Sequence, residues 1–136
     1  MRLSSGTVRR RRLLLVDPDA VYRAGLEEPL EMALWSLHAH ADAPSALAWL
    51  EKNPNQDVDA IWCEAALRDV RAEELIARVR ALRPGLPALI VSATDESGVA
   101  PDAIRKFSKR ETAAAVRWLL ALATDPEVEK QQLPYS

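Results

Sequence analysis

Four short runs of mainly apolar residues recur along the chain, at 12–17, 35–41, 58–64 and 87–92. The first, third and fourth are nearly unbroken and do not alternate with polar residues. Unbroken runs of roughly 4 to 8 residues are typical of strands that are buried on both faces of a parallel sheet. We therefore predict four strands at these positions.

Segments with helical periodicity separate these strands. The first begins at Asp19, a residue suited to capping a helix, and Pro29 is expected to kink this helix or end it early. The others are predicted at 42–51, 72–82 and 110–123. Alternating strands and helices with short links favour right-handed crossovers, with helices on both faces of a parallel sheet.

The alternation breaks between the fourth strand and the last helix. A fifth strand is predicted at 103–106, and only about ten residues separate it from Ser92. Gly98 and Pro101 within this segment oppose a helix of ordinary length. We therefore expect the helix at this place to be missing or cut to a single turn.

Length and composition indicate one globular domain. The chain has 136 residues, of which 49% are hydrophobic and 28% charged, with a net charge of -2. A folded part is predicted at 11–124, between a flexible basic arm at 1–10 and a loose tail at 125–136. No apolar stretch reaches the roughly 18 residues of a membrane span. The single cysteine, Cys63, lies in a predicted buried strand, so we expect a structural thiol and a cytoplasmic location.

Polar residues stand at the ends of the predicted strands. Asp17 ends the first, Glu64 the third and Ser92 the fourth, and Arg23 follows the first acid by six residues. In open α/β folds the chemistry gathers at the carboxyl ends of such strands. This order of residues resembles the receiver domain of two-component response regulators. The resemblance implies a flavodoxin-like, doubly wound parallel sheet of five strands in the order 2-1-3-4-5.

In receiver domains, two adjacent acids after the first strand bind Mg²⁺ together with an aspartate that accepts the phosphoryl group. Asp17 matches the first acid, Pro18 replaces the second, and Glu64 stands in place of the aspartate. Mg²⁺ prefers near-octahedral oxygen ligands, so each missing carboxylate matters. The resemblance therefore indicates a degenerate receiver, or pseudo-receiver, with no metal or cofactor.

The family also uses a hydroxyl and a lysine from later strands. Ser92 matches the hydroxyl that contacts the phosphoryl group. For the lysine that neutralises this group, Lys106 fits best if the fifth strand ends there, with Lys109 and Arg105 as alternatives. Glu64 could hold a permanently switched-on arrangement with a lysine and Ser92, or it could be a tolerated acid in a domain that no longer switches. We favour the second interpretation.

These departures predict a stand-alone, non-enzymatic adaptor in bacterial signal transduction that acts without phosphorylation. Such a domain keeps surfaces that bind a signalling protein or a second copy of itself. The predicted surface lies on the last helix, at Val116, Arg117 and Trp118.

Two alternative functions have some support in the sequence. A nucleic-acid-binding module would use the run Arg9 to Arg12, but no recognition helix or aromatic platform accompanies it, and a solvated arm explains the run. A domain that is still phosphorylated would need Asp17 or Asp69 as the acceptor. His38 and His40 share one face of a strand without a third metal ligand, so we interpret them as surface or half-buried side chains.

Overall fold

The structure is a computed structural model that describes residues 10–94 and 98–123. The predicted arm, apart from Arg10, and the predicted tail lie outside these ranges. The described residues form a sheet and four α-helices, in the chain order β1 Arg11–Val16, α1 Ala20–Met32, β2 Trp35–His40, α2 Ala43–Lys52, β3 Ala60–Glu64, α3 Ala72–Leu82, β4 Ala88–Ser92, β5 Gly98–Ala100, β6 Ile104–Ser108 and α4 Thr112–Ala123. None of these helices is both long and apolar enough to cross a membrane.

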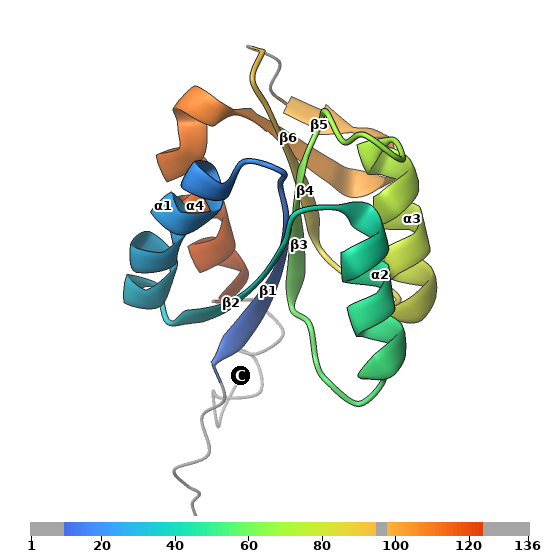
Figure 1. Cartoon of the computed structure of the whole chain (residues 1–136). Coiled ribbons are helices and arrows are strands. Elements are labelled where there is room, and N and C mark those ends of the chain that lie inside the picture. Colours follow the sequence, from blue (N-terminus) through green and yellow to red (C-terminus); the bar gives the residue numbers. More distant parts are fainter. Residues whose placement is uncertain (1–9, 95–97, 124–136) are drawn as a thin grey trace, which may run out of the picture.

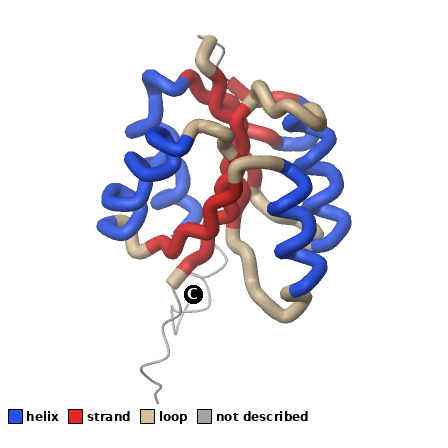
Figure 2. The backbone as a smooth tube through the Cα atoms, in the orientation of Figure 1, coloured by secondary structure: helices blue, strands red, loops and turns tan. Residues whose placement is uncertain are grey.

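The strands form one sheet in the order β2-β1-β3-β4-β6-β5. Every neighbouring pair is parallel except β5 and β6, which are antiparallel. Helices α1 and α4 lie on one face of the sheet, and α2 and α3 lie on the other (Figure 1). The tube in Figure 2 shows the resulting three layers, with the strands between two pairs of helices. The predicted flavodoxin-like fold is confirmed.

The predicted loss of a helix between the fourth and fifth parallel strands is also confirmed. No α-helix joins β4 to β6 within the described ranges. Instead, β5 pairs with the outer edge of β6, and a 3₁₀ turn at Pro101–Ala103 connects the two. Asp102 and Ala103 adopt left-handed backbone angles, with φ of 65° and 57°, to make this tight return. The prediction of five strands was wrong by this extra edge strand.

Two details of the predicted elements need correction. Of the two effects expected of Pro29, a kink or an early end, the early end was wrong, because α1 continues through Pro29 to Met32. Pro29 is exposed, so the carbonyl that loses its partner one turn earlier can bind water. The fifth parallel strand runs from Ile104 to Ser108, two residues past the predicted end at Lys106.

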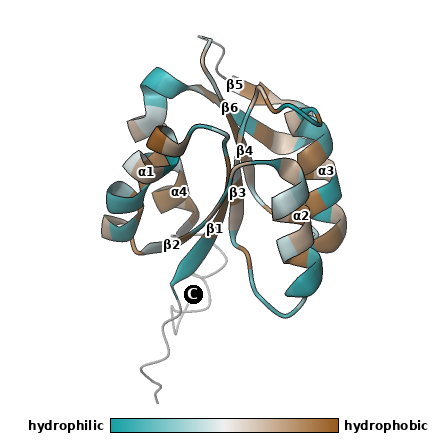
Figure 3. Cartoon of the chain, in the orientation of Figure 1, coloured by the Kyte–Doolittle hydropathy of each residue, from teal (hydrophilic) through white to brown (hydrophobic). Residues whose placement is uncertain are grey.

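The core consists of two layers separated by the sheet. Alternate residues of each strand face opposite layers, because side chains alternate across a strand. Leu14, Ile61 and Ile90 pack toward α2 and α3, whereas Leu15 and Trp62 pack toward α1 and α4. All five residues of β3 are buried, which explains why that strand reads as an unbroken apolar run. Figure 3 shows hydrophobic residues along the central strands and hydrophilic residues on the outer sides of the helices.

Candidate functional site

Two carboxylates meet at the carboxyl edge of the sheet. The strands β1 and β3 are parallel neighbours in which Val16 pairs with Cys63, so the residues that follow, Asp17 and Glu64, lie side by side. Both are buried: Asp17 is 0% exposed and Glu64 is 6% exposed. Buried acids of this kind need a counter-charge or hydrogen-bond donors, because burial disfavours the ionised form.

Lys109 supplies the counter-charge. Its Nζ lies 2.7 Å from Oε1 of Glu64 and 3.3 Å from Oδ2 of Asp17. Lys109 is the first residue after β6, in a 3₁₀ turn that leads into α4. The strand therefore delivers a lysine to the acids from the other side of β4.

Lys109 was one of two alternatives for this position. The candidate that fitted best, Lys106, and the other alternative, Arg105, lie elsewhere. Lys106 belongs to the opposite face of the sheet, where its Nζ lies 3.8 Å from Oε2 of Glu73. Arg105 stacks its guanidinium over Phe107, with Cζ 5.3 Å from the ring centroid. The signal that could have placed the end of the strand is the capping box formed by Ser108 and Glu111, a Ser-x-x-Glu pattern that marks the start of a helix.

Backbone groups bind the remaining oxygens of the two acids. The N–H of Asp19 donates to Oδ1 of Asp17 at 2.8 Å, and the N–H of Ala66 donates to Oε2 of Glu64 at 3.2 Å. Arg23 donates from Nη1 to the carbonyl of Asp17 at 2.7 Å and so fixes the loop after β1. As predicted, Asp19 caps α1, since its Oδ1 accepts from the N–H groups of the first turn.

Burial and neighbouring groups shift the pKa values of Asp17 and Lys109. Burial raises the pKa of Asp17 above its usual value, and the Asp19 N–H and the Lys109 ammonium only partly oppose this rise. Burial alone would lower the pKa of Lys109, but the hydrogen bond to Glu64 and the charge of Asp17 outweigh it, so the pKa of Lys109 is raised. The ammonium is therefore held in its charged form.

Two side chains that sequence reasoning missed support Lys109. Its Nζ lies 4.4 Å from the centroid of the Tyr22 ring, on α1. The Tyr22 hydroxyl hydrogen-bonds with Oγ1 of Thr112 at 2.8 Å, and Thr112 donates to the carbonyl of Lys109 at 2.7 Å. The contacts of Tyr22 join residues far apart in the chain, and no local pattern in the sequence indicates them.

The remaining family positions do not join the cluster. Pro18 is exposed and offers no side-chain oxygen. The Ser92 hydroxyl hydrogen-bonds with Oγ1 of Thr94 at 2.8 Å and accepts from the Thr94 N–H at 3.1 Å. It thus belongs to its own turn after β4.

The cluster does not fit Mg²⁺, the ion that the receiver fold implies. Mg²⁺ needs several oxygen ligands around it. Here an ammonium lies within 3.3 Å of both carboxylates, and Pro18 replaces one ligand. In the described part of the chain, no three His, Cys, Asp or Glu side chains come together in a metal-binding geometry.

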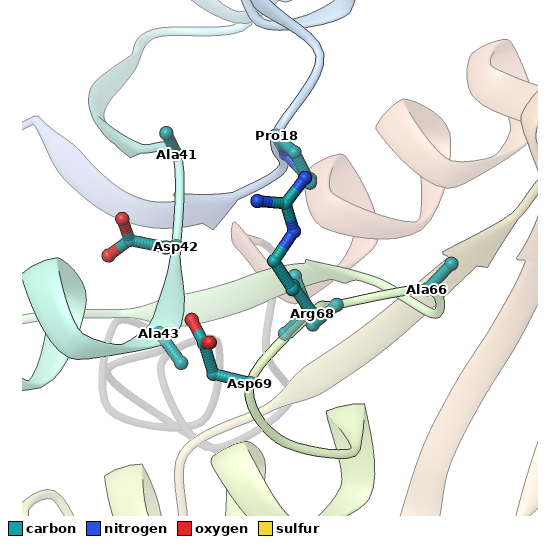
Figure 4. Close-up of a pocket in the computed structure, with 8 residues that line it drawn as sticks. Pro18, Ala41, Asp42, Ala43, Ala66, Arg68 and Asp69 are labelled. Atoms are coloured by element: carbon teal, nitrogen blue, oxygen red, sulfur yellow. The ribbon is translucent and has the colours of Figure 1, made fainter.

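A surface pocket of about 610 Å³ lies beside the cluster, between the loops that follow β1, β2 and β3. Figure 4 shows Arg68 extending toward Pro18, with Asp69 on the same loop and Asp42 on the segment that leads into α2. Asp69 is exposed here, and the ion pairs of Lys109 are to Asp17 and Glu64. The alternative acceptor Asp69 therefore stands apart from the lysine.

The two histidines, the cysteine and the last arginine of the basic run contact other parts of the fold. His38 and His40 lie beside Trp49, with ring centroids 4.5 Å and 6.3 Å away. Cys63 is fully buried, and this burial raises the pKa of its thiol. Arg12 donates from Nη1 to Gln56 and to the carbonyl of Asp57, so the last arginine of the basic run binds the fold itself.

The residues predicted as a partner surface lie on α4. Arg117 is exposed, whereas Val116 and Trp118 are half-buried and pack against the core. Two further apolar side chains are exposed: Leu120 on α4 is 42% exposed, and Val99 on β5 is 68% exposed.

Comparison with known sequences gives one distant relative. No protein-family model matches the chain. Over 81 residues, 60% of this chain, the sequence is 28% identical to the DNA-binding transcriptional regulator NtrC of Rhizobium meliloti (strain 1021). The match spans 16% of that protein's length.

Solved structures give closer matches in shape. The signal receiver domain of an HD domain-containing protein from Pseudomonas fluorescens Pf-5 matches with a TM-score of 0.68 and 24% identity, over 86% of this chain and 100% of that one. A response regulator receiver protein from Sinorhizobium medicae WSM419 matches with a TM-score of 0.65 and 18% identity, over 85% and 98% of the two chains. The strand order and these neighbours together show that the chain has the receiver fold of response regulators.

Proposed function

We propose that this domain is a pseudo-receiver, which binds a signalling partner without being phosphorylated. The observation that carries the proposal is the direct pairing of Glu64 with Lys109 at 2.7 Å, at the place where the family has its acceptor aspartate. In this proposal the paired carboxylate is a fixed part of the fold. The domain acts by binding and not by catalysis.

Phosphoryl transfer needs a well-placed nucleophile and neutralisation of the developing charge by a metal. Glu64 carries its oxygens one methylene farther from the backbone than aspartate does. One of these oxygens faces Lys109, and the other accepts from Ala66. Pro18 withholds a metal ligand. These features support loss of the transfer reaction.

The arrangement at Ser92 favours a fixed site over an imitation of the phosphorylated state. An imitation would engage the hydroxyl at the end of β4 together with the lysine. The Ser92 hydroxyl instead bonds with Thr94, while Lys109 binds Glu64 and Asp17. Glu64 is thus a structural acid in this proposal.

The proposed partner surface is the outer side of α4 together with β5. Loss of the usual helix does not expose β6, because β5 covers its edge and Ile104 and Phe107 stay buried. Val99 pairs with Arg105, so it faces the same layer as α4. Exposed Val99, Leu120 and Arg117 then supply apolar and charged contacts for a signalling protein or a second copy.

A titration with beryllofluoride and Mg²⁺, followed by amide NMR, tests the proposal. The wild type should give no saturable shifts at Asp17, Glu64 and Ser92. The variant Glu64→Asp separates the effect of the side chain's length from that of the missing ligand. The double variant Pro18→Asp/Glu64→Asp restores both acids and serves as the positive control. Saturable local shifts in the wild type would overturn the proposal.

The surface is tested separately with Arg117→Glu. Self-association or capture of a signalling partner should weaken. Arg110→Glu, which reverses a charge in the turn before the same helix, serves as the matched comparison. Unchanged binding by Arg117→Glu would count against α4 as the contact surface.

A further inference from the structure

The acid cluster contains a built-in cation. Asp17 and Glu64 are almost completely buried, and the Lys109 ammonium lies 3.3 Å and 2.7 Å from them. Oδ2 of Asp17 has no hydrogen bond from any other described group, so the ammonium is its nearest compensation. A single positive charge thus faces two carboxylates from one side.

A lysine side chain is long and flexible, and needs to be held if it is to stay in such a place. The Lys109 side chain is still 23% exposed, so a path to solvent is open to it. The face of the Tyr22 ring lies against the ammonium at 4.4 Å. Aromatic faces attract cations, and more strongly where water is partly excluded.

The ring itself is fixed by the element that carries the lysine. Tyr22 bonds through its hydroxyl to Thr112, and Thr112 also donates to the backbone carbonyl of Lys109. Tyr22 on α1 therefore contacts the lysine twice: its ring contacts the ammonium, and its hydroxyl is linked through Thr112 to the lysine backbone. An aliphatic side chain at position 22 could fill the space but would lack the attraction for the charge.

We propose that Tyr22 is a positioning residue that holds the Lys109 ammonium between Glu64 and Asp17, where it takes the place of a divalent cation and keeps one out. The inference deepens the pseudo-receiver proposal and rests on it for its biological meaning. Its test uses no partner and no phosphodonor, so either proposal can fail while the other stands.

The test is an Mn²⁺ titration of the full chain, with amide NMR at Asp19 and Ala66, whose N–H groups bind the two acids. Mn²⁺ replaces Mg²⁺ as a paramagnetic ion of similar ligand preference. The same spectra report the ring-current shift of the Lys109 side chain. Tyr22→Leu removes the ring, Tyr22→Phe keeps it and removes the hydroxyl, and Lys106→Met is the control for general charge.

The wild type should show a ring-current shift at Lys109 and no saturable broadening at Asp19 or Ala66. Tyr22→Leu should lose the shift and show saturable Mn²⁺ broadening at Asp19 and Ala66. Its affinity should exceed the upper limit set by the wild type by about tenfold or more, the scale of one partly desolvated cation–π contact. Tyr22→Phe, which keeps the ring but loses its bond to Thr112, should fall between the wild type and Tyr22→Leu. Lys106→Met should behave as the wild type.

Three results would overturn the inference: saturable Mn²⁺ binding at the wild-type cluster, a Tyr22→Leu variant identical to the wild type, or a Tyr22→Phe variant identical to Tyr22→Leu. If Tyr22→Leu does not fold, ring-fluorinated phenylalanine at position 22 keeps the shape and weakens the negative face. If the chemical shifts of Lys109 do not change as fluorine is added, after correction for the ring current of each ring, the proposed role of the ring is wrong.

Discussion

Two lysines three residues apart at the end of β6 occupy opposite environments. Lys109 pairs at 2.7 Å with Glu64, a buried acid, and faces a second buried acid at 3.3 Å. Lys106 lies 3.8 Å from Glu73, whose side chain is 43% exposed. The first region is closed and its charges depend on each other, whereas the second is open to water. The two side chains are identical, so their position in the chain decides which lysine pairs with the buried acids.

The largest expected effect comes from Lys109→Met. Removing one partner of a buried charge cluster leaves the others uncompensated, which costs about 3 to 5 kcal/mol of unfolding free energy. Urea denaturation at neutral pH measures this loss. A loss no larger than that of a surface substitution would break the contrast between the two regions.

The pH dependence sharpens the same prediction. The pKa of Lys109 is raised above its ordinary 10.5 by the hydrogen bond to Glu64 and the nearby Asp17, which outweigh its burial. A raised lysine pKa gives stability that is complete below about pH 10.5 and is lost as the pH rises through the folded value. The difference between the wild type and Lys109→Met should therefore shrink in that alkaline range. A constant difference would contradict the assignment.

A smaller effect of opposite sign is expected for Asp17→Asn. Burial raises the pKa of Asp17, so its ionised form costs stability at neutral pH. Asparagine keeps the acceptor for the Asp19 N–H without the charge, so the variant should match the wild type or exceed it by up to about 1 kcal/mol at pH 7. Any gain should fade as the pH falls through the raised pKa of folded Asp17, and it should be gone below 3.8, the ordinary value, where the folded and unfolded chains both hold the proton. Denaturation curves at the two pH values measure it, and a clear loss at pH 7 would refute it.

The smallest effect is expected for Lys106→Met. An exposed ion pair at this distance contributes at most about 1 kcal/mol, and salt screens it. The same urea assay, repeated at high salt, gives the value. A loss approaching that of Lys109→Met would show that the Lys106–Glu73 pair contributes as much stability as a buried ion pair.

The fold follows from sequence because its signals are strong and local. The buried strands β1, β3 and β4 are apolar runs, and α3 lies at Ala72–Leu82, the predicted range. The strand β5 was missed because it has only three residues, two of them exposed, and contains Gly98. Such a strand exists through its pairing with β6, and single-sequence patterns carry no information on pairing.

The candidate site was predictable only in part. Topology alone brings Asp17 and Glu64 together, since parallel neighbours end at the same edge. The lysine depended on where β6 ends, and a shift of two residues moved the choice from Lys106 to Lys109. The role of Tyr22 depends on a tertiary contact between α1 and the turn before α4, which no spacing reveals.

The tight return at Asp102 and Ala103 also bears on the order of folding. A parallel pair joined through a helix must wait for distant residues to meet, but β5 and β6 meet through a turn of a few residues, with Ala100 opposite Ile104. Local contacts of this kind form early, because little chain entropy is lost in closing a short loop. We expect β6 to pair with β5 first and to join the sheet as half of a hairpin. Lys109, which follows β6, would then reach the two acids when that hairpin docks.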